Sequence, residues 1–103
     1  MRYYTLEKRI NLYDGYRKVF KIDQHHLMLL QIEGERYLVE SFCPHRAFPL
    51  STSDVFGLKL VCPKHRYEFE IATGELVKCT DEPCRNLKVY PLVEEDREVG
   101  VSL

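Results

Sequence analysis

Two short motifs, Cys43-Pro44-His45 and Cys62-Pro63-Lys64-His65, decide how this chain folds and what it can bind. Sixteen residues separate the histidine of the first motif from the cysteine of the second, and a proline directly follows each cysteine. Proline fixes φ at about −65° and has no backbone N–H, so it stiffens each loop beside its thiol. Each motif therefore offers one thiolate and one imidazole from a stiff loop, and together they form a candidate metal site.

The segments around the motifs alternate between polar and apolar residues, which predicts strands rather than helices. Residues 27–32 and 37–42 flank Glu33-Gly34-Glu35-Arg36, which predicts a hairpin running into Cys43. Further strands are expected at residues 17–22, 58–61, 67–71, 87–90 and 99–103. Many short strands with regular turns predict an all-β fold, a small antiparallel β-sandwich or barrel. Both motifs then lie on loops at strand ends and form a metal-binding part of approximately residues 42–70.

Length and composition indicate one small soluble domain over residues 1–103. The chain has a mass of 12.2 kDa, with 45% hydrophobic and 30% charged residues. No apolar run approaches the roughly 18 residues of a membrane span, and the start of the chain lacks the apolar core of a signal peptide. We therefore expect a cytoplasmic protein with no membrane contact, in which four cysteines are metal ligands or free thiols rather than a disulfide framework.

Charge is spread unevenly along the chain. Residues 43–66 carry a net charge of +3, and residues 67–103 carry −5. The basic part consists of Arg46, Lys59, Lys64 and Arg66, which surround the candidate ligands in sequence. It is either an ordinary solvated face or a collar that attracts an acidic redox partner. Fifteen basic residues against sixteen acidic ones, without a basic stripe, argue against nucleic-acid binding.

The residue types of the candidate site leave three interpretations. Structural zinc accepts two Cys and two His, although zinc sites usually begin with paired cysteines and close with paired histidines. Alternatively the side chains hold no metal, and Cys43 and Cys62 are free or joined as a disulfide. The interleaved order of ligands and the twin prolines favour a third interpretation, a two-iron cluster in which two histidines replace two cysteines on one iron.

The sequence resembles the Rieske family over roughly residues 37–103. Residues 43–51 are similar to the family pattern C-P-H-R-G-x-P-L-S, and residues 62–69 are similar to C-P-x-H-G-Y-x-F. Thr73-Gly74-Glu75 resembles the turn that follows in this family, and residues 87–91 resemble a later strand. The chain is therefore identified as a Rieske-type [2Fe–2S] ferredoxin, a component of systems that resemble ring-hydroxylating dioxygenases.

This resemblance implies one [2Fe–2S] cluster, with Cys43 and Cys62 on the inner iron and His45 and His65 on the outer iron. It implies a one-electron carrier without a catalytic site of its own, which passes electrons from a flavin-dependent reductase to a terminal oxygenase. We expect a monomer or weak oligomer. One alternative is an accessory subunit of a larger oxidoreductase, like the small subunit of a nitrite reductase, and a weaker one is a zinc-binding interaction module.

The resemblance also predicts a low reduction potential. High-potential members have a disulfide between the ligand loops, and this chain has Phe48 and Lys64 at the matching positions. Those members also have a Ser and a Tyr that donate hydrogen bonds to the cluster. Here the matching residues are Tyr67, which is too long to imitate Ser, and Phe69, which has no hydroxyl.

Several neighbouring residues carry weaker expectations. Ala47 and Arg66 stand where the family usually has Gly, so the loops either hold a strained left-handed backbone or differ locally. Cys79 and Cys84 are interpreted as free thiols on a loop, with Cys84 beside the cluster. Residues 48–50 are expected to form an apolar skirt around the ligands.

Overall fold

The computed structural model describes residues 1–103 and contains strands, one 3-10 turn (η1, Arg9–Asn11) and no α-helix. The strands are β1 (Tyr3–Lys8), β2 (Arg17–Ile22), β3 (His25–Ile32), β4 (Glu35–Glu40), β5 (Asp54–Phe56), β6 (Lys59–Val61), β7 (Glu68–Glu70), β8 (Leu76–Lys78), β9 (Val89–Tyr90), β10 (Leu92–Glu94) and β11 (Glu98–Ser102). The predicted all-β class is confirmed.

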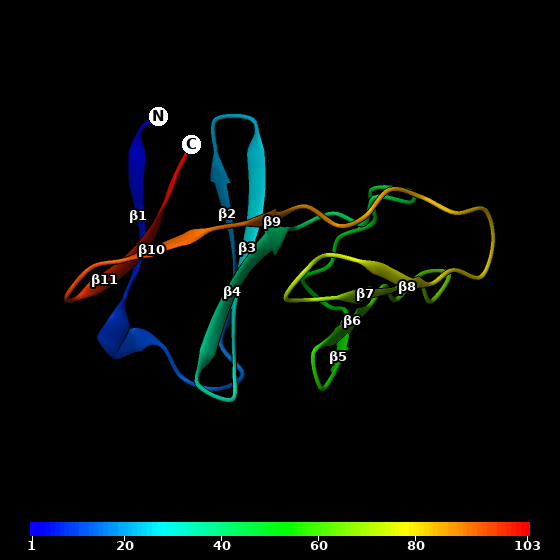
Figure 1. The fold of residues 1–103 in the computed structure, drawn as a ribbon, viewed down its shortest axis with the longest axis horizontal. Coiled ribbons are helices and arrows are strands. Elements are labelled where there is room, and N and C mark those ends of the chain that lie inside the picture. Colours follow the sequence, from blue (N-terminus) through cyan, green and yellow to red (C-terminus); the bar gives the residue numbers. More distant parts are fainter.

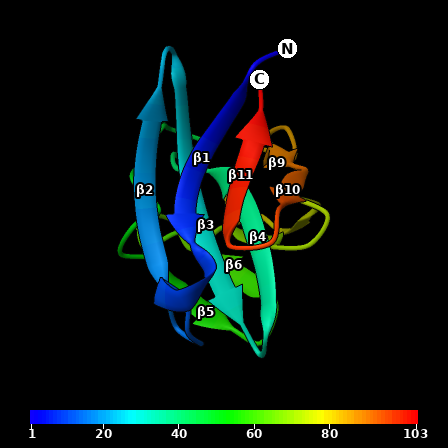
Figure 2. The ribbon, with the colours of Figure 1, turned by 90° about the vertical axis from the view of Figure 1, so that its left-hand side faces the viewer.

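The strands form three antiparallel sheets, with the orders β1-β11-β10, β2-β3-β4-β9 and β5-β6-β7-β8. The first two sheets lie together at one end of a molecule that measures 43 × 28 × 19 Å, and the third lies at the other end (Figure 1). Seen from the first end, β1 and β11 cross in front of β3 and β4 (Figure 2). We call the end with the first two sheets the base half and the end with the third sheet the site half.

The middle sheet is covered on both faces, and β3 shows this directly. On one side Leu27 and Leu29 join a core that packs against the first sheet. On the other side Met28 and Leu30 join a core that extends into the site half. Because successive side chains of a strand point to opposite faces, β3 is apolar at every position from 27 to 30. The longest apolar run of the chain is thus its central strand.

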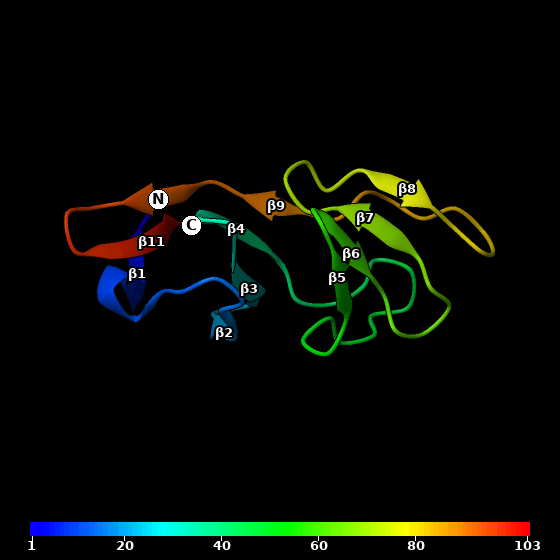
Figure 3. The same cartoon turned by 90° about the horizontal axis from the view of Figure 1, so that it is seen from below.

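The site half is one insertion between β4 and β9, which are neighbours in the middle sheet. The chain leaves the base half after Glu40 and returns before Val89. Viewed from below, the segments after β4 and before β9 connect the two halves (Figure 3). Both ligand motifs lie in this insertion. The first follows β4 of the middle sheet, and the second follows β6 of the third sheet.

The predicted hairpin is present, but its turn is shorter than expected. Residues 33 and 34 alone connect β3 to β4, because Glu35 and Arg36 pair with Ile32 and Gln31. Other predicted strands shift by one or two residues, so that 58–61, 67–71 and 87–90 become 59–61, 68–70 and 89–90. Strands β1, β5, β8 and β10 were not predicted, and three of these have only three residues. No helix of this fold is long and apolar enough to cross a membrane.

Candidate metal centre

The two ligand loops are built in the same way. The backbone N–H of Cys43 donates to the carbonyl of Phe48, and that of Cys62 donates to the carbonyl of Tyr67, both at 2.8 Å. In each loop a chain reversal of six residues begins at the cysteine and is closed by this bond. Cys43 follows shortly after β4, and Cys62 directly follows β6. The sheets of both halves therefore fix where the two thiols lie.

Each loop contains a left-handed residue directly before its closing residue. The φ angle is 54° at Ala47 and 57° at Arg66, and His65 itself has a φ of 72°. Ala47 and Arg66 occupy the two positions where the family usually has glycine. The loops therefore keep the left-handed geometry and accept its cost, on the order of 1–2 kcal/mol per non-glycine residue.

All four predicted ligands line one hollow of about 190 Å³ between the two loops. The residues around it are Cys43, His45, Arg46, Phe48, Cys62, Lys64 and His65. Cys43 and Cys62 are each only 2% exposed, whereas His45 is partly exposed and His65 is exposed. The thiols thus lie on the protein side of the hollow, and the imidazoles lie toward its rim.

The two imidazoles face one another across the rim. Their ring centroids are 5.2 Å apart, and the planes are nearly perpendicular at 86°. The ring of His45 also stacks on Tyr67, with centroids 4.1 Å apart and an angle of 11°. The hydroxyl of Tyr67 donates to the carbonyl of Glu82, so it does not point to the ligands as a donor. This supports the expectation that Tyr67 does not replace the serine of high-potential members.

The buried thiols are suited to binding metal rather than to reacting with reagents in solution. Both are free rather than joined as a disulfide. Burial raises the pKa of the Cys62 thiol, and its neighbour Cys43 raises it further by disfavouring a second negative charge. Two buried thiols side by side are therefore poorly stabilised as anions by the protein alone. A bound cation supplies the missing positive charge, since metal ligation replaces the thiol proton.

The four predicted ligands form two pairs with different surroundings. Two thiols lie on the buried side of the hollow, and two imidazoles lie toward its rim. Such a donor set fits a group with more than one metal atom, in which the two pairs hold different atoms.

The surroundings of the hollow correct one expectation and support others. Leu50 is fully buried in the core that contains Cys43 and Cys62, and of the expected apolar skirt only Phe48 lines the hollow. Cys84 is partly buried and packs against the core that contains Cys43 and Cys62, whereas Cys79 is exposed. Neither forms a disulfide in this structure.

Basic side chains surround the hollow. Arg46 and Lys64 line it and are exposed, and the ammonium group of Lys64 lies 5.9 Å from the ring centroid of Phe48. Arg66 pairs with Asp54 at 3.1 Å, and both side chains are more than half exposed. Reasoning from sequence missed this pairing and the roles of Tyr67 and Thr80, whose hydroxyl donates to the carbonyl of His65.

Comparison with known proteins gives a family. Residues 2–91 match the Rieske [2Fe-2S] domain. The chain is 30% identical over 82 residues to the ferredoxin component of the naphthalene 1,2-dioxygenase system of Pseudomonas aeruginosa, covering 80% of this chain and 77% of that one. It is 30% identical over 83 residues to the ferredoxin component of the naphthalene 1,2-dioxygenase/salicylate 5-hydroxylase systems of Ralstonia sp, covering 81% and 78%.

The fold also matches a solved structure. It superimposes on the ferredoxin of carbazole 1,9a-dioxygenase from Nocardioides aromaticivorans IC177 with a TM-score of 0.82 and 20% identity. The match covers 99% of this chain and 98% of that one. At this identity the likeness confirms the fold alone.

Proposed function

We propose that this chain, which belongs to the Rieske [2Fe-2S] domain family, carries single electrons from a flavin-dependent reductase to a terminal oxygenase. Its cofactor is one [2Fe–2S] cluster, so the zinc interpretation is set aside. The relatives named above are ferredoxin components of dioxygenase systems, which supports this place between two redox proteins.

One observation carries the assignment of the site: two buried thiols and two outward imidazoles line the same hollow. We propose Cys43 and Cys62 as the inner ligands and His45 and His65 as the outer ligands. The bound cluster supplies reversible one-electron chemistry, and two neutral imidazoles in place of thiolates raise its potential into the range of about −150 to +300 mV.

The protein residues determine how this chemistry is used. The cysteine loops keep water from the inner side, because Cys43 and Cys62 are almost completely buried. His65 reaches solvent and gives electrons a short path to a partner docked at the rim. Phe69 is fully buried and has no hydroxyl, and the hydroxyl of Tyr67 is bonded to Glu82. Neither Tyr67 nor Phe69 therefore donates a hydrogen bond to the cluster, and we expect a reduction potential in the lower half of the family range.

The face around the imidazoles suits brief docking. It combines the apolar ring of Phe48 with the exposed cations Arg46 and Lys64. A small apolar centre with a charged rim favours fast, salt-sensitive encounters rather than a permanent interface. This favours a free carrier over an accessory subunit of a larger oxidoreductase. We further propose that the protein has no catalytic site of its own and works in the cytoplasm, where thiols such as Cys79 stay reduced.

The test combines analysis of the bound metal with an electron-transfer assay. The purified protein should be red-brown and contain equal iron and acid-labile sulfide. It should also restore electron flow from NADH and the flavin reductase of a naphthalene dioxygenase system to cytochrome c as an artificial acceptor. A redox titration should give a midpoint in the lower half of the range of about −150 to +300 mV. A midpoint near the top, or zinc in place of iron, would overturn the proposal.

A further inference from the structure

The segment that returns from β8 toward β9 passes the candidate metal centre. We call its first part, residues 79–85, the strap. The strap forms no strand or helix. Its position is therefore set by side-chain bonds and packing, and these can be followed from its outer end to its inner end.

At its outer end the strap is bonded to the second ligand loop, residues 62–67. The hydroxyl of Thr80 donates to the carbonyl of His65, and the hydroxyl of Tyr67 donates to the carbonyl of Glu82. Tyr67 also stacks on the imidazole of His45. A displacement of the strap would therefore act on the backbone of one outer ligand and on the ring that packs against the other.

Between these bonds and its inner end, the strap packs against the core that extends into the site half. Cys84 packs against the core that contains Cys43 and Cys62. Cys79, at the start of the strap, is exposed. The strap therefore carries one covered and one open thiol, which differ in their access to solvent.

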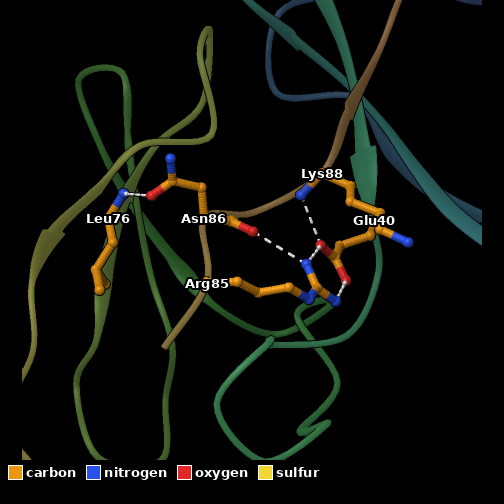
Figure 4. A network of polar contacts seen from close by, with 5 residues as sticks. All are labelled: Glu40, Leu76, Arg85, Asn86 and Lys88. Carbon is orange, nitrogen blue, oxygen red and sulfur yellow. Dashed lines mark hydrogen bonds and ion pairs between the residues drawn. The ribbon is translucent and has the colours of Figure 1, made fainter. Parts of the chain in front are cut away.

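At its inner end the strap is held by one carboxylate of the base half. Glu40, the last residue of β4, accepts hydrogen bonds from both terminal nitrogens of Arg85, at 2.6 and 2.8 Å (Figure 4). The same carboxylate accepts the backbone N–H of Lys88 at 2.6 Å. The bidentate geometry fixes both the distance and the orientation of the Arg85 side chain.

The residues just beyond the strap are fixed independently. Asn86 accepts the backbone N–H of Leu76 through its side-chain oxygen at 3.0 Å, and the backbone N–H of Leu87 donates to Gly74 at 2.7 Å (Figure 4 shows the former). Loss of the pair between Arg85 and Glu40 would therefore leave residues 86 and 87 in place. Only the strap itself would lose its inner attachment.

The exposure of the pair indicates a stronger tie than an ordinary surface ion pair. The side chain of Glu40 is 12% exposed, and that of Arg85 is 51% exposed. Because water reaches this carboxylate poorly, its charge is stabilised mainly by its hydrogen-bond donors, more than that of a solvent-exposed carboxylate is. Hydrogen bonding to Glu40 also raises the pKa of Arg85, so the pair keeps its charge throughout the working range.

We propose that Glu40 and Arg85 are positioning residues for the metal centre: their ion pair holds the strap against the second ligand loop. It keeps Cys84 packed against the core that contains Cys43 and Cys62, and it fixes the contacts of the strap to His65 and Tyr67. The consequence for the cluster rests on the proposed function, but the position of the strap can be measured by itself.

The test compares the two thiols of the strap in the intact holoprotein. Iodoacetamide labelling, followed by mass spectrometry, gives the rate at Cys84 relative to the rate at Cys79. In Arg85→Gln and in Glu40→Gln this ratio should rise about five-fold, because the covered thiol opens more often. Arg85→Lys, which keeps the charge, should recover part of the protection. The EPR spectrum of the reduced cluster should change in Arg85→Gln and return toward the parent spectrum in Arg85→Lys.

A matched control is Arg36→Gln. It removes another arginine–carboxylate pair of β4, with Glu94 at 2.8 Å, which lies in the base half and not on the strap. The labelling ratio should stay unchanged in this variant. An unchanged ratio in both Arg85→Gln and Glu40→Gln would overturn the proposal, and so would an equal rise in Arg36→Gln.

Labelling of the ligand thiols separates this proposal from the proposed function. A rise at Cys84 that is matched by equal labelling of Cys43 and Cys62 would show loss of the cluster rather than release of the strap, and would also overturn the proposal. If Cys43 and Cys62 are labelled in the parent protein too, the proposed function fails. The comparison of Cys84 with Cys79 still decides the position of the strap.

Discussion

At the scale of single residues, the two ligand loops hold left-handed backbone without glycine. Ala47 has a φ of 54° and is exposed, so its side chain contributes little packing in return for this strain. Ala47→Gly should raise the melting temperature of the holoprotein by a few degrees, corresponding to about 0.5–1 kcal/mol after the added freedom of the unfolded chain is subtracted. Differential scanning calorimetry measures this directly.

The control for this prediction is Ala72→Gly, an exposed alanine in the turn after β7 whose φ is not positive. It should lower the melting temperature, because only the unfolded chain gains from the change. If both substitutions shift the midpoint in the same direction, the left-handed residue at 47 is not a source of strain.

The sequence also predicted the placement of the four ligands. The order and spacing of Cys43, His45, Cys62 and His65 predicted a common site, and the structure brings all four to one hollow. The role of Leu50 was predicted wrongly, because its place beside Pro49 in sequence says nothing of which face of the loop it occupies. Tyr67 stacked on His45 could not be foreseen either, since a stacking contact between two loops depends on their relative placement.

At the scale of the elements, the hairpin of β3 and β4 was predictable, whereas β1, β5, β8 and β10 were not. β3 and β4 pair over six residues each and carry a clear pattern. Strands such as β5, β8 and β10 have three residues, too few to show a period, and exist because neighbouring backbone offers partners. That the site half is inserted between two paired strands also depends on contacts far apart in sequence.

The turn between β7 and β8 gives an element-scale prediction. A Cβ added at Gly74 would lie 2.0 Å from the carbonyl oxygen of Leu87, which belongs to the segment returning to the base half. Gly74→Ala should therefore lower the stability by more than about 2 kcal/mol, since backbone must move. Gly57→Ala is the control, because Gly57 also has a positive φ, of 60°, but nothing lies within 4 Å. Its cost should be about 1 kcal/mol. Equal losses of melting temperature in the two variants would contradict the close approach.

The attachment of β1 gives a pH-dependent prediction. Hydrogen bonds from Asn11, Tyr16 and the backbone of Lys8 lower the pKa of Glu7 from 4.5 to about 2. The folded state therefore favours the carboxylate, and this contribution is present above pH 4.5 and lost as the pH falls toward 2.

We expect Glu7→Gln to cost about 1 kcal/mol at neutral pH, discounted for partial exposure of the site, and progressively less below pH 4.5. Thermal melts of parent and variant at a series of pH values measure the difference. A difference that stays constant down to about pH 3 would show that the carboxylate form is not favoured by folding.

At the scale of the whole molecule, two exposed arginines lie at opposite ends of the long axis. Arg46 lies at the candidate docking face in the site half, whereas Arg97 lies in the turn between β10 and β11 at the opposite end (Figure 1). Arg46→Glu should raise the KM of the cognate reductase for this carrier about three- to ten-fold at low salt and flatten its salt dependence. Stopped-flow reduction at several ionic strengths provides the measurement.

Arg97→Glu changes the net charge of the protein by the same amount and serves as the control. Its KM and salt dependence should remain those of the parent. If the two variants slow reduction equally, net charge rather than the local face controls the encounter.

We propose that both halves form one domain, residues 1–103, because the middle sheet supplies a face to each core. The central claim, however, concerns the ligands within it: one iron of the cluster is bound by two histidines, His45 and His65. Electron spin echo envelope modulation of the dithionite-reduced protein tests this most directly. We predict couplings from two directly bound nitrogens, of which one disappears in His65→Cys; a spectrum without directly bound nitrogen would contradict the account.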